Sequence, residues 1–115
     1  MIRTKRVYEP PKREDGYRVL VDRLWPHGLS RDAAQVDLWL REVAPSDALR
    51  RWFGHDPAKW TAFREKYRAE LRSVGEEPLA ELRRLAAEQP VLTLLYAAKD
   101  DRHNNAVVLR EMLEA

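Results

Sequence analysis

Two short segments of the chain, residues 18–22 and 91–96, each contain a nearly continuous apolar run. Because polar residues do not alternate with the apolar ones, both faces of these segments are expected to be covered, as in the central strands of a parallel sheet. A third segment, residues 3–8, alternates more regularly and is followed by Pro10 and Pro11, which lack the N–H that a sheet ladder requires. We therefore predict two buried strands and one edge strand.

Between residues 24 and 90 the apolar residues follow helical spacing. Ser30 is a candidate N-cap for a first helix that ends before Pro45. Ser46 is a candidate N-cap for a second, shorter helix that Gly54 ends. The apolar positions of the first helix are Val36, Trp39, Leu40 and Val43, and those of the second are Leu49, Trp52 and Phe53.

Two longer helices and a final one are predicted after these. Asp56 can cap a helix that has Pro57 in its first position, where the missing N–H costs nothing. Gly75 ends that helix, Pro78 opens the next and Pro90 ends it. Their inward residues are Trp60, Phe63, Tyr67 and Leu71 in the first, and Leu79, Leu82, Leu85 and Ala86 in the second. The final helix carries Val108, Leu109, Met112 and Leu113.

The order strand, helices, strand, helix predicts an α/β fold. The helical crossover between the two buried strands, residues 24–90, is long enough to join them in parallel, which is the usual arrangement for such a connection. We expect a small three-layer-like domain with a short, mostly parallel sheet of about three strands and about five helices. The chain shows no internal repeat or long linker, so residues 1–115 are expected to form a single domain.

Composition and charge exclude several classes of protein. The chain has 115 residues without a cysteine, which rules out a disulfide framework and thiolate chemistry. Its 21 basic and 19 acidic residues give a net charge of +2, and the small excess lies in residues 1–23. This is not the concentrated basic surface of a dedicated nucleic-acid-binding protein, so a nucleic-acid partner is disfavoured. No apolar run approaches the ~20 residues of a membrane span, and we expect a cytoplasmic protein with no membrane partner.

The segments after the two buried strands hold most of the candidate chemistry. Parallel strands end at the same edge of a sheet, so residues 22–28 and 97–105 should meet in one crevice. The second segment also leads into a helix, whose first N–H groups favour an anion. The candidate catalytic residues are Asp22 and His103, and the candidate ligand-binding residues are Arg23, Trp25, His27, Lys99, Asn104 and Asn105.

A purely structural interpretation of the same residues stays open. Asp100 or Asp101 can cap the last helix, and Asp22 can pair with Arg23 or Arg18 in a structural ion pair. Trp25, like the other tryptophans, can be part of the core. The sequence alone does not separate these roles from a ligand site.

Four stretches carry a resemblance to a known family: residues 5–8 (KRVY), 16–26 (GYRVLVDRLWP), 94–99 (LLYAAK) and 103–106 (HNNA). Together with Pro45-Ser46, Leu49-Arg50 and the aromatic helix at Phe63 and Tyr67, the chain resembles the YeaO-like family of bacterial proteins along nearly its whole length. That family has no established function. The resemblance implies a compact α/β domain with both loops at one pole of the sheet.

The chain departs from relatives at two places. Where it has His27, relatives commonly have arginine, which suits a cation or hydrogen-bond donor better than a proton shuttle. More distant members place a Cys-His-Arg turn where this chain has His103-Asn104-Asn105, and without a cysteine it cannot form a thiolate nucleophile.

Metal and cofactor sites are not predicted. The histidines His27, His55 and His103 lack the spacing of a recognised metal motif, and His55, beside Asp56, is interpreted as part of a local turn. No glycine-rich phosphate loop or serine triad is present, so we expect no nucleotide cofactor. Arg64, Arg68 and Arg72 form a row on one helix, which we interpret as a solvated surface of mixed charge.

Two functional hypotheses follow. In the first, the crevice binds a small anion, and the protein is a hydrolase or transferase acting on a phosphorylated or carboxylated metabolite. Asp22 would then orient Arg23 or act as a base, Arg23 and Lys99 would hold charge, and His103 would be the acid or base. In the second, the protein is a non-catalytic module that engages nucleic acid or a protein partner through its basic N-terminal segment and the arginine row. Neither the oligomeric state nor the ligand follows from the sequence.

Overall fold

The computed structural model describes residues 1–73 and 76–115. In these ranges the strands are β1 (Ile2–Arg6), β2 (Tyr17–Leu20), β3 (Leu38–Trp39) and β4 (Leu92–Tyr96). The helices are α1 (Arg31–Ala34), α2 (Asp47–Phe53), α3 (Trp60–Ser73), α4 (Glu76–Glu88) and α5 (Asn105–Glu114). Three short 3₁₀ turns cover Arg13–Asp15, Arg41–Val43 and Pro57–Lys59. The predicted α/β class with five helices is confirmed, and the sheet has one more strand than expected.

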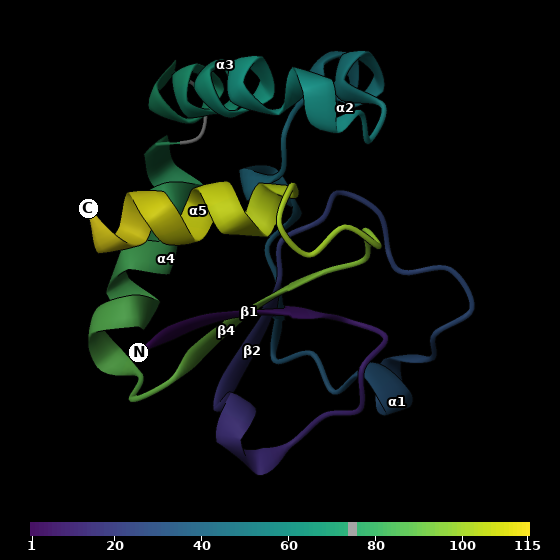
Figure 1. The fold of residues 1–115 in the computed structure, drawn as a ribbon. Coiled ribbons are helices and arrows are strands. Elements are labelled where there is room, and N and C mark those ends of the chain that lie inside the picture. Colours follow the sequence, from purple (N-terminus) through teal and green to yellow (C-terminus); the bar gives the residue numbers. More distant parts are fainter. Residues whose placement is uncertain (74–75) are drawn as a thin grey trace.

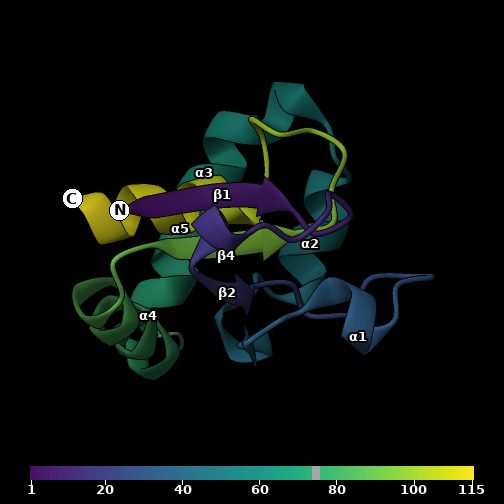
Figure 2. The same cartoon turned by 90° about the horizontal axis from the view of Figure 1, so that it is seen from below.

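The four strands form one parallel sheet in the order β1-β4-β2-β3. β4 lies between β1 and β2, and its Leu94 pairs with Thr4 on one side and Val19 on the other. β1 is at an edge, as predicted, and β2 and β4 are the buried parallel neighbours that the two apolar runs predicted. All strands therefore point their carboxyl ends toward the same side of the molecule, the right-hand side in Figure 1 (see also Figure 2).

The two faces of the sheet are covered differently. One face packs against the helices, where α5 contacts β1 and β4 and lies between the sheet and α3 (Figure 1). This main core includes Val19, Leu94 and Leu109, all fully buried. The opposite face presents a smaller cluster covered mainly by the segment between β2 and β3. That cluster contains Val7, Leu20 and Leu95, with Trp25, Leu29, Val36, Trp39 and Ala97 packed against it.

The predicted helix from Ser30 to Pro45 is wrong. Ser30 does cap a helix, since its side chain accepts a hydrogen bond from Ala33 N, but α1 ends after four residues. Gln35 then takes a left-handed conformation with φ 47°, which an α-helix cannot continue through. The following residues instead pair with β2, where Leu38 aligns with Val19. This segment has the apolar spacing of a helix, but it forms hydrogen bonds with the open edge of β2. Tertiary pairing therefore outweighs the local helical preference.

The start signals of α2 and α3 are confirmed. The Ser46 side chain accepts a hydrogen bond from Leu49 N, and Gly54 ends α2 in a left-handed conformation. Asp56 accepts from Ala58 N, and the turn that it caps runs directly into α3. Phe63, Tyr67 and Leu71 form the buried stripe of α3, with Trp60 partly buried beside them. Pro90 follows the end of α4, as predicted. Pro78 lies in the first turn of α4 rather than at its start, because the helix begins at Glu76. Gly75 is outside the described residues.

One apolar position of α2 was wrongly assigned. The side chain of Trp52 is 39% exposed, and the ammonium groups of Lys59 and Lys66 lie over its ring at 5.1 and 5.4 Å from the ring centre. Its spacing matches the buried face, but α2 is short and Trp52 falls on its outer edge, where cations cover an aromatic surface that the core does not reach.

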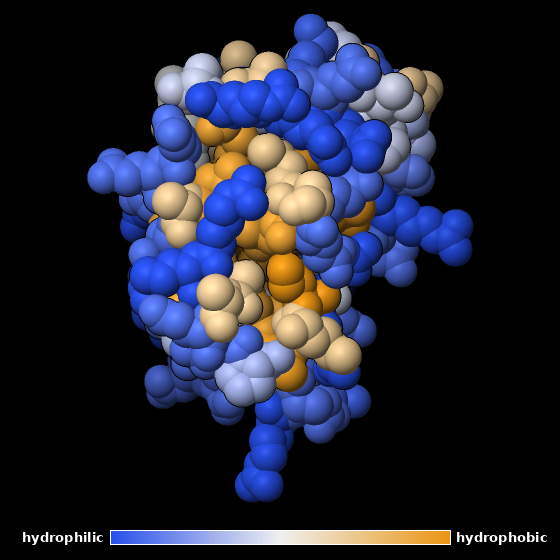
Figure 3. All heavy atoms as spheres, turned by 90° about the vertical axis from the view of Figure 1, so that its left-hand side faces the viewer, coloured by the Kyte–Doolittle hydropathy of each residue, from blue (hydrophilic) through white to orange (hydrophobic). Residues whose placement is uncertain are grey.

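The two ends of the molecule differ in character. Figure 3 shows the left-hand side of Figure 1, near the chain termini, where apolar side chains form a band between hydrophilic ones. Met1, 71% exposed, is the most exposed large apolar residue of the described chain. Within the described ranges no helix is both long and apolar enough to cross a membrane. The opposite end, at the carboxyl ends of the strands, is where the polar loops gather.

Candidate functional site

A pocket of about 780 Å³ lies at the carboxyl ends of β2 and β4. Its walls come from the loop after β2, the loop after β4, the start of α5 and the region around α2. All eight residues predicted as site residues line it: Asp22, Arg23, Trp25, His27, Lys99, His103, Asn104 and Asn105. The parallel arrangement of β2 and β4 explains this, because it delivers both loops to one edge.

Asp22 joins the two loops at the floor of the pocket. Its Oδ2 accepts a hydrogen bond from Ala97 N at 2.9 Å, and its Oδ1 accepts one from Asn105 Nδ2 at 3.2 Å. Asn105 Nδ2 also donates to the carbonyl oxygen of Val21 at 2.9 Å. Asn105 therefore fixes the start of α5 to the end of β2 and aims at the carboxylate of Asp22.

Burial raises the pKa of Asp22 above its ordinary value. The hydrogen bonds from Ala97 and Asn105 and the positive charges of Arg50 and His55 act in the opposite direction, but they do not cancel the cost of burial. A carboxylate kept in this environment lowers the stability of the fold at neutral pH. Such costs are commonly found at sites that serve a ligand.

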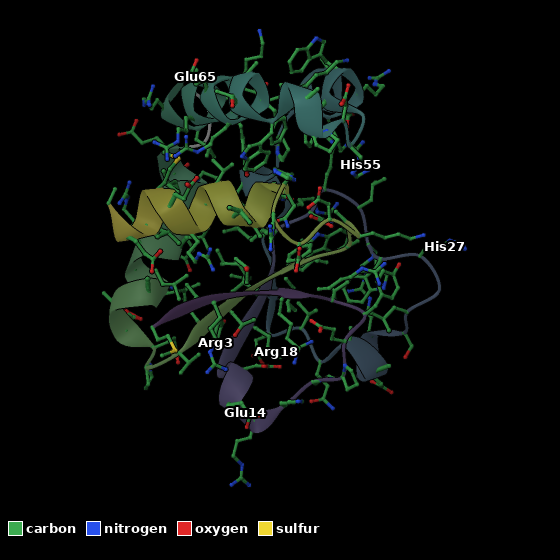
Figure 4. The ribbon with its side chains drawn as sticks, viewed as in Figure 1. Arg3, Glu14, Arg18, His27, His55 and Glu65 are labelled. Atoms are coloured by element: carbon green, nitrogen blue, oxygen red, sulfur yellow. The ribbon has the colours of Figure 1, made fainter. Side chains whose placement is uncertain are left out.

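The structural ion pair proposed for Asp22 is wrong. Arg18 belongs to a different, buried cluster, where its Nη1 lies 2.6 Å from Asp15 Oδ2 and Lys5 Nζ lies 2.9 Å from the same oxygen. Arg23 is paired with Asp47, at 3.3 Å. Figure 4 shows Arg18 near Arg3 and Glu14, far from the loops that form the pocket. Among the described residues, no charged nitrogen forms an ion pair with Asp22.

Four cationic side chains line the pocket: Arg6, Arg23, Arg50 and Lys99. Arg23 Nε and Arg50 Nη2 share one oxygen, Asp47 Oδ1, at 3.3 and 2.9 Å. The Nε atom of Arg6 donates to the carbonyl oxygens of Ala97 and Ala98, at 3.1 and 3.2 Å. Lys99 is exposed. Two carboxylates, Asp22 and Asp100, line the same pocket, so its charged groups have a positive balance.

His103 is oriented by a neighbouring carboxylate. Its Nδ1 lies 2.8 Å from Asp100 Oδ2, and its ring meets the ring of Trp60 edge-on at 5.2 Å between centres. Hydrogen bonds from Arg102 N and from His103 hold the pKa of Asp100 below its usual value. Asp100 therefore stays ionised at neutral pH and keeps the imidazole in one orientation.

The cap of α5 is Asn104, so the expectation that Asp100 or Asp101 caps this helix is wrong. Asn104 Oδ1 accepts from Val107 N at 3.2 Å, and its Nδ2 donates to Asp100 O at 2.9 Å. Asp100 instead accepts from the backbone N–H groups of Arg102 and His103, which closes the turn before the helix. Both ends of the Asn104 amide are thus engaged in shaping the loop.

Trp25 and His27 lie in the outer loop of the pocket. Trp25 is partly buried, packs edge-on against Trp39 and donates from Nε1 to Leu29 O at 2.6 Å. His27 is exposed, and Figure 4 shows its side chain projecting away from the body of the molecule. The carbonyl oxygen of His27 accepts a hydrogen bond from the Tyr8 hydroxyl at 2.8 Å, which ties this loop to the end of β1.

Sequence reasoning missed several residues of the pocket: Arg6, Tyr8, Arg50, Phe53, His55 and Phe63. Arg6 could have been found, because it ends a third parallel strand whose carboxyl end reaches the same edge. Arg50 gave no such signal, since its place depends on how α2 folds back over the loops. His55 has a left-handed conformation with φ 58°, as a residue in a tight turn can, but it also lines the pocket (Figure 4).

A metal site and the arginine row of α3 are the two other features that the sequence raised. In the described part of the chain, no group of three or more His, Asp or Glu side chains is arranged to hold a metal ion. In the arginine row of α3, Arg64 and Arg68 both lie beside Glu111 of α5, at 2.8 and 3.6 Å. The row is therefore partly neutralised by a neighbouring helix.

Comparison with known proteins supports the resemblance carried by the sequence motifs. The family described as "Inactive DUF488-N3 subclade" matches residues 1–115. The uncharacterised protein YeaO of Escherichia coli is 44% identical over 114 residues, which cover 99% of this chain and 97% of that protein. Uncharacterised proteins of Mycobacterium bovis and Mycobacterium tuberculosis are each 41% identical over 112 residues, covering 97% of this chain and 92% of theirs. No solved structure gives a significant match. The chain therefore belongs to the YeaO-like family, the inactive DUF488-N3 subclade, whose compared members are uncharacterised.

Proposed function

We propose that this protein binds a small anionic metabolite in the pocket at the carboxyl ends of β2 and β4, as a binding protein rather than an enzyme. The observation that carries the proposal is the pair Arg23 and Arg50, two guanidinium groups that share a single carboxylate oxygen at the pocket wall. One carboxylate neutralises only one of the two charges. The pair therefore carries an excess positive charge that can attract a further anion.

The surroundings of this pair add to the attraction for an anion. Arg6 and Lys99 contribute two more positive charges to the lining. The first turn of α5 begins at the pocket, and the free N–H groups of a helix start favour negative charge. The pocket volume is in the range that holds a metabolite.

The lack of a cysteine, serine or threonine nucleophile in the pocket supports binding without catalysis. The chain has no cysteine, and no serine or threonine is among the described residues that line the pocket. The family description carries the word "inactive", which fits the same conclusion.

A second candidate is a hydrolase or transferase in which His103 acts as acid or base. The contact between His103 Nδ1 and Asp100 favours it, because such a pairing fixes the tautomer and leaves Nε2 for proton transfer. The two candidates differ in one test: replacing His103 by alanine abolishes turnover in an enzyme but leaves ligand affinity nearly unchanged in a binding protein.

Thermal unfolding in the presence of a panel of phosphorylated and carboxylated metabolites tests the proposal. A ligand that binds only the folded state raises the unfolding temperature, by a stabilisation of about 2.7 kcal/mol at a hundred times its dissociation constant. We expect Arg50→Ala to abolish the shift. The matched control is Arg84→Ala, because Arg84 is also an ion-paired helical arginine but lies on α4, away from the pocket. A shift that is equal in both variants, or no shift with any anion, would contradict the proposal.

A further inference from the structure

We infer that the ligand of this pocket is a hydroxylated phosphate ester, whose phosphate is held between Arg23 and Arg50 and whose hydroxyl groups donate to Asp22. This inference rests on the proposed function and makes it specific, because it assigns separate parts of the ligand to separate parts of the pocket. Two classes of ligand carry both a phosphate ester and free hydroxyl groups: sugar phosphates, and nucleotides through their ribose phosphate.

The spacing of the two guanidinium groups suits a phosphate. Arg23 Nε and Arg50 Nη2 are within 3.3 Å of the same oxygen of Asp47, so these nitrogens are at most about 6 Å apart. Each contacts that oxygen through one nitrogen, so the other N–H donors of each guanidinium group are not used in this ion pair. A carboxylate presents two oxygens, enough for one fork, whereas the three terminal oxygens of a phosphate ester can accept from both.

Asp22 supplies the complementary acceptor. Its two oxygens each accept one hydrogen bond from the protein, from Ala97 N and Asn105 Nδ2, and each carboxylate oxygen can accept two. In the described part of the chain the protein gives this partly buried carboxylate no cationic partner, although four cations line the same pocket. Because Asp22 lines the pocket, a ligand bound there can use the remaining acceptor capacity.

The donor that Asp22 receives is a neutral hydroxyl rather than an ammonium group. Four cationic side chains line the pocket, and three carboxylates lie in or beside its lining: Asp22, Asp100 and the Asp47 that contacts Arg23 and Arg50. The remaining excess of positive charge disfavours a positively charged ligand group. A hydroxyl donates a hydrogen bond to a carboxylate without adding charge, and such charge-assisted bonds are short and strong.

One small molecule can reach both subsites. Arg50 is close enough to Asp22 for its positive charge to help lower the pKa of that carboxyl, against the larger effect of burial. Both side chains line the same pocket of about 780 Å³. Phe53 and Phe63, which are buried and stacked at 4.2 Å between ring centres, also line it, so part of its wall is apolar.

Calorimetric titration with four probes tests the inference: inorganic phosphate, ribose, ribose 5-phosphate and adenosine 5′-monophosphate. In the unmodified protein we expect ribose 5-phosphate to bind at least about tenfold more tightly than inorganic phosphate, and ribose alone to bind too weakly to detect. Tighter binding of the nucleotide than of ribose 5-phosphate would identify a nucleotide as the source. Equal binding of these two probes would identify a sugar phosphate.

The variant Asp22→Asn separates the hydroxyl subsite from the phosphate subsite. It removes a negative charge, so its affinity for inorganic phosphate should stay the same or rise, while its affinity for ribose 5-phosphate should fall about ten- to a hundredfold. A loss of affinity for ribose 5-phosphate without a loss for inorganic phosphate cannot come from partial unfolding, which would weaken the binding of both probes. The matched control Asp101→Asn removes an exposed carboxylate of the same loop that does not line the pocket, and it should keep the preference for ribose 5-phosphate.

The outcomes separate this inference from the proposed function. If neither inorganic phosphate nor either phosphate ester binds, the phosphate ester is refuted as the ligand. The proposed anion pocket is then decided by the thermal-unfolding panel, and it is wrong only if the carboxylated metabolites also give no shift. If inorganic phosphate binds as tightly as ribose 5-phosphate, or if Asp22→Asn keeps the preference, the pocket binds anions but the hydroxyl subsite is refuted.

Discussion

Replacing Asn105 by alanine removes two hydrogen bonds that hold the pocket together. Asn105 Nδ2 donates to the charged carboxylate of Asp22 and to the carbonyl oxygen of Val21. A hydrogen bond to a charged group contributes about 1.5–3 kcal/mol, and one between neutral groups about 0.5–1.5 kcal/mol. Alanine is the better helix former and returns about 0.5 kcal/mol. We expect a net loss of about 1.5–4 kcal/mol, a large part of the ~5–15 kcal/mol that stabilises a typical domain.

The same substitution should show a characteristic dependence on pH. Because the folded-state pKa of Asp22 is raised, the folded protein holds a proton at pH values where the unfolded chain has lost it. Ionised Asp22 therefore lowers the free energy of unfolding at neutral pH, and this cost disappears as the pH falls through the raised pKa toward the ordinary value of 3.8. Loss of the Asn105 donor raises the pKa of Asp22 further, so the variant recovers more stability on acidification than the unmodified protein does.

Urea unfolding followed by tryptophan fluorescence measures both effects. The difference in unfolding free energy between Asn105→Ala and the unmodified protein should be larger at pH 7 than near pH 4.5. Carboxylates elsewhere with lowered pKa values, such as Asp15, titrate in both proteins and cancel in the difference. Thr61→Ala, an exposed substitution in α3, is the control and should change stability by less than about 0.5 kcal/mol. A loss below about 0.5 kcal/mol for Asn105→Ala, or one that does not vary with pH, would refute the role given to this side chain.

Two further substitutions test the parts of the fold that position the pocket. Phe63→Ala should lower the free energy of unfolding by about 3–5 kcal/mol, because Phe63 is buried and stacked on Phe53. A loss under about 1 kcal/mol in the same urea assay would mean that this face of α3 is not in the core. Arg18→Ala should cost about 3–5 kcal/mol, because it removes one of the two cations that contact the buried carboxylate of Asp15 and leaves the carbonyl oxygens of Ala34 and Gln35 without their donor. A near-zero change in thermal unfolding would show that this buried cluster adds nothing to stability.

The sequence predicted the sheet neighbours and the pocket loops because both depend on strong local signals. An unbroken apolar run marks a strand covered on both faces, and two such strands joined by helices end at one edge. These signals alone place Asp22 and His103 at one pocket. They do not give the partners of these residues, since Asn105 reaches Asp22 only after α5 has docked on β4.

The sequence-based predictions that the structure contradicts or that missed a pocket residue have a common physical cause. The segment after Ser30 has helical spacing, but hydrogen bonds to the open edge of β2, such as Asp37 N to Arg18 O, decided its structure. Trp52 follows the period of a buried face, yet the short helix α2 leaves it at the surface. Arg50 enters the pocket through the packing of α2 against α3. Each case depends on contacts between segments distant in the chain, which periodicity does not record.

An NMR titration of the isotopically labelled protein with ribose 5-phosphate tests most directly whether the pocket binds this ligand. We expect the largest changes in backbone amide chemical shift on residues 22–27, 50–55 and 97–107, around the pocket, and no change on residues 13–18, at the opposite end of the sheet. Changes spread evenly over exposed lysines and arginines, or concentrated on the arginine row of α3, would contradict a specific anion pocket at the carboxyl ends of β2 and β4.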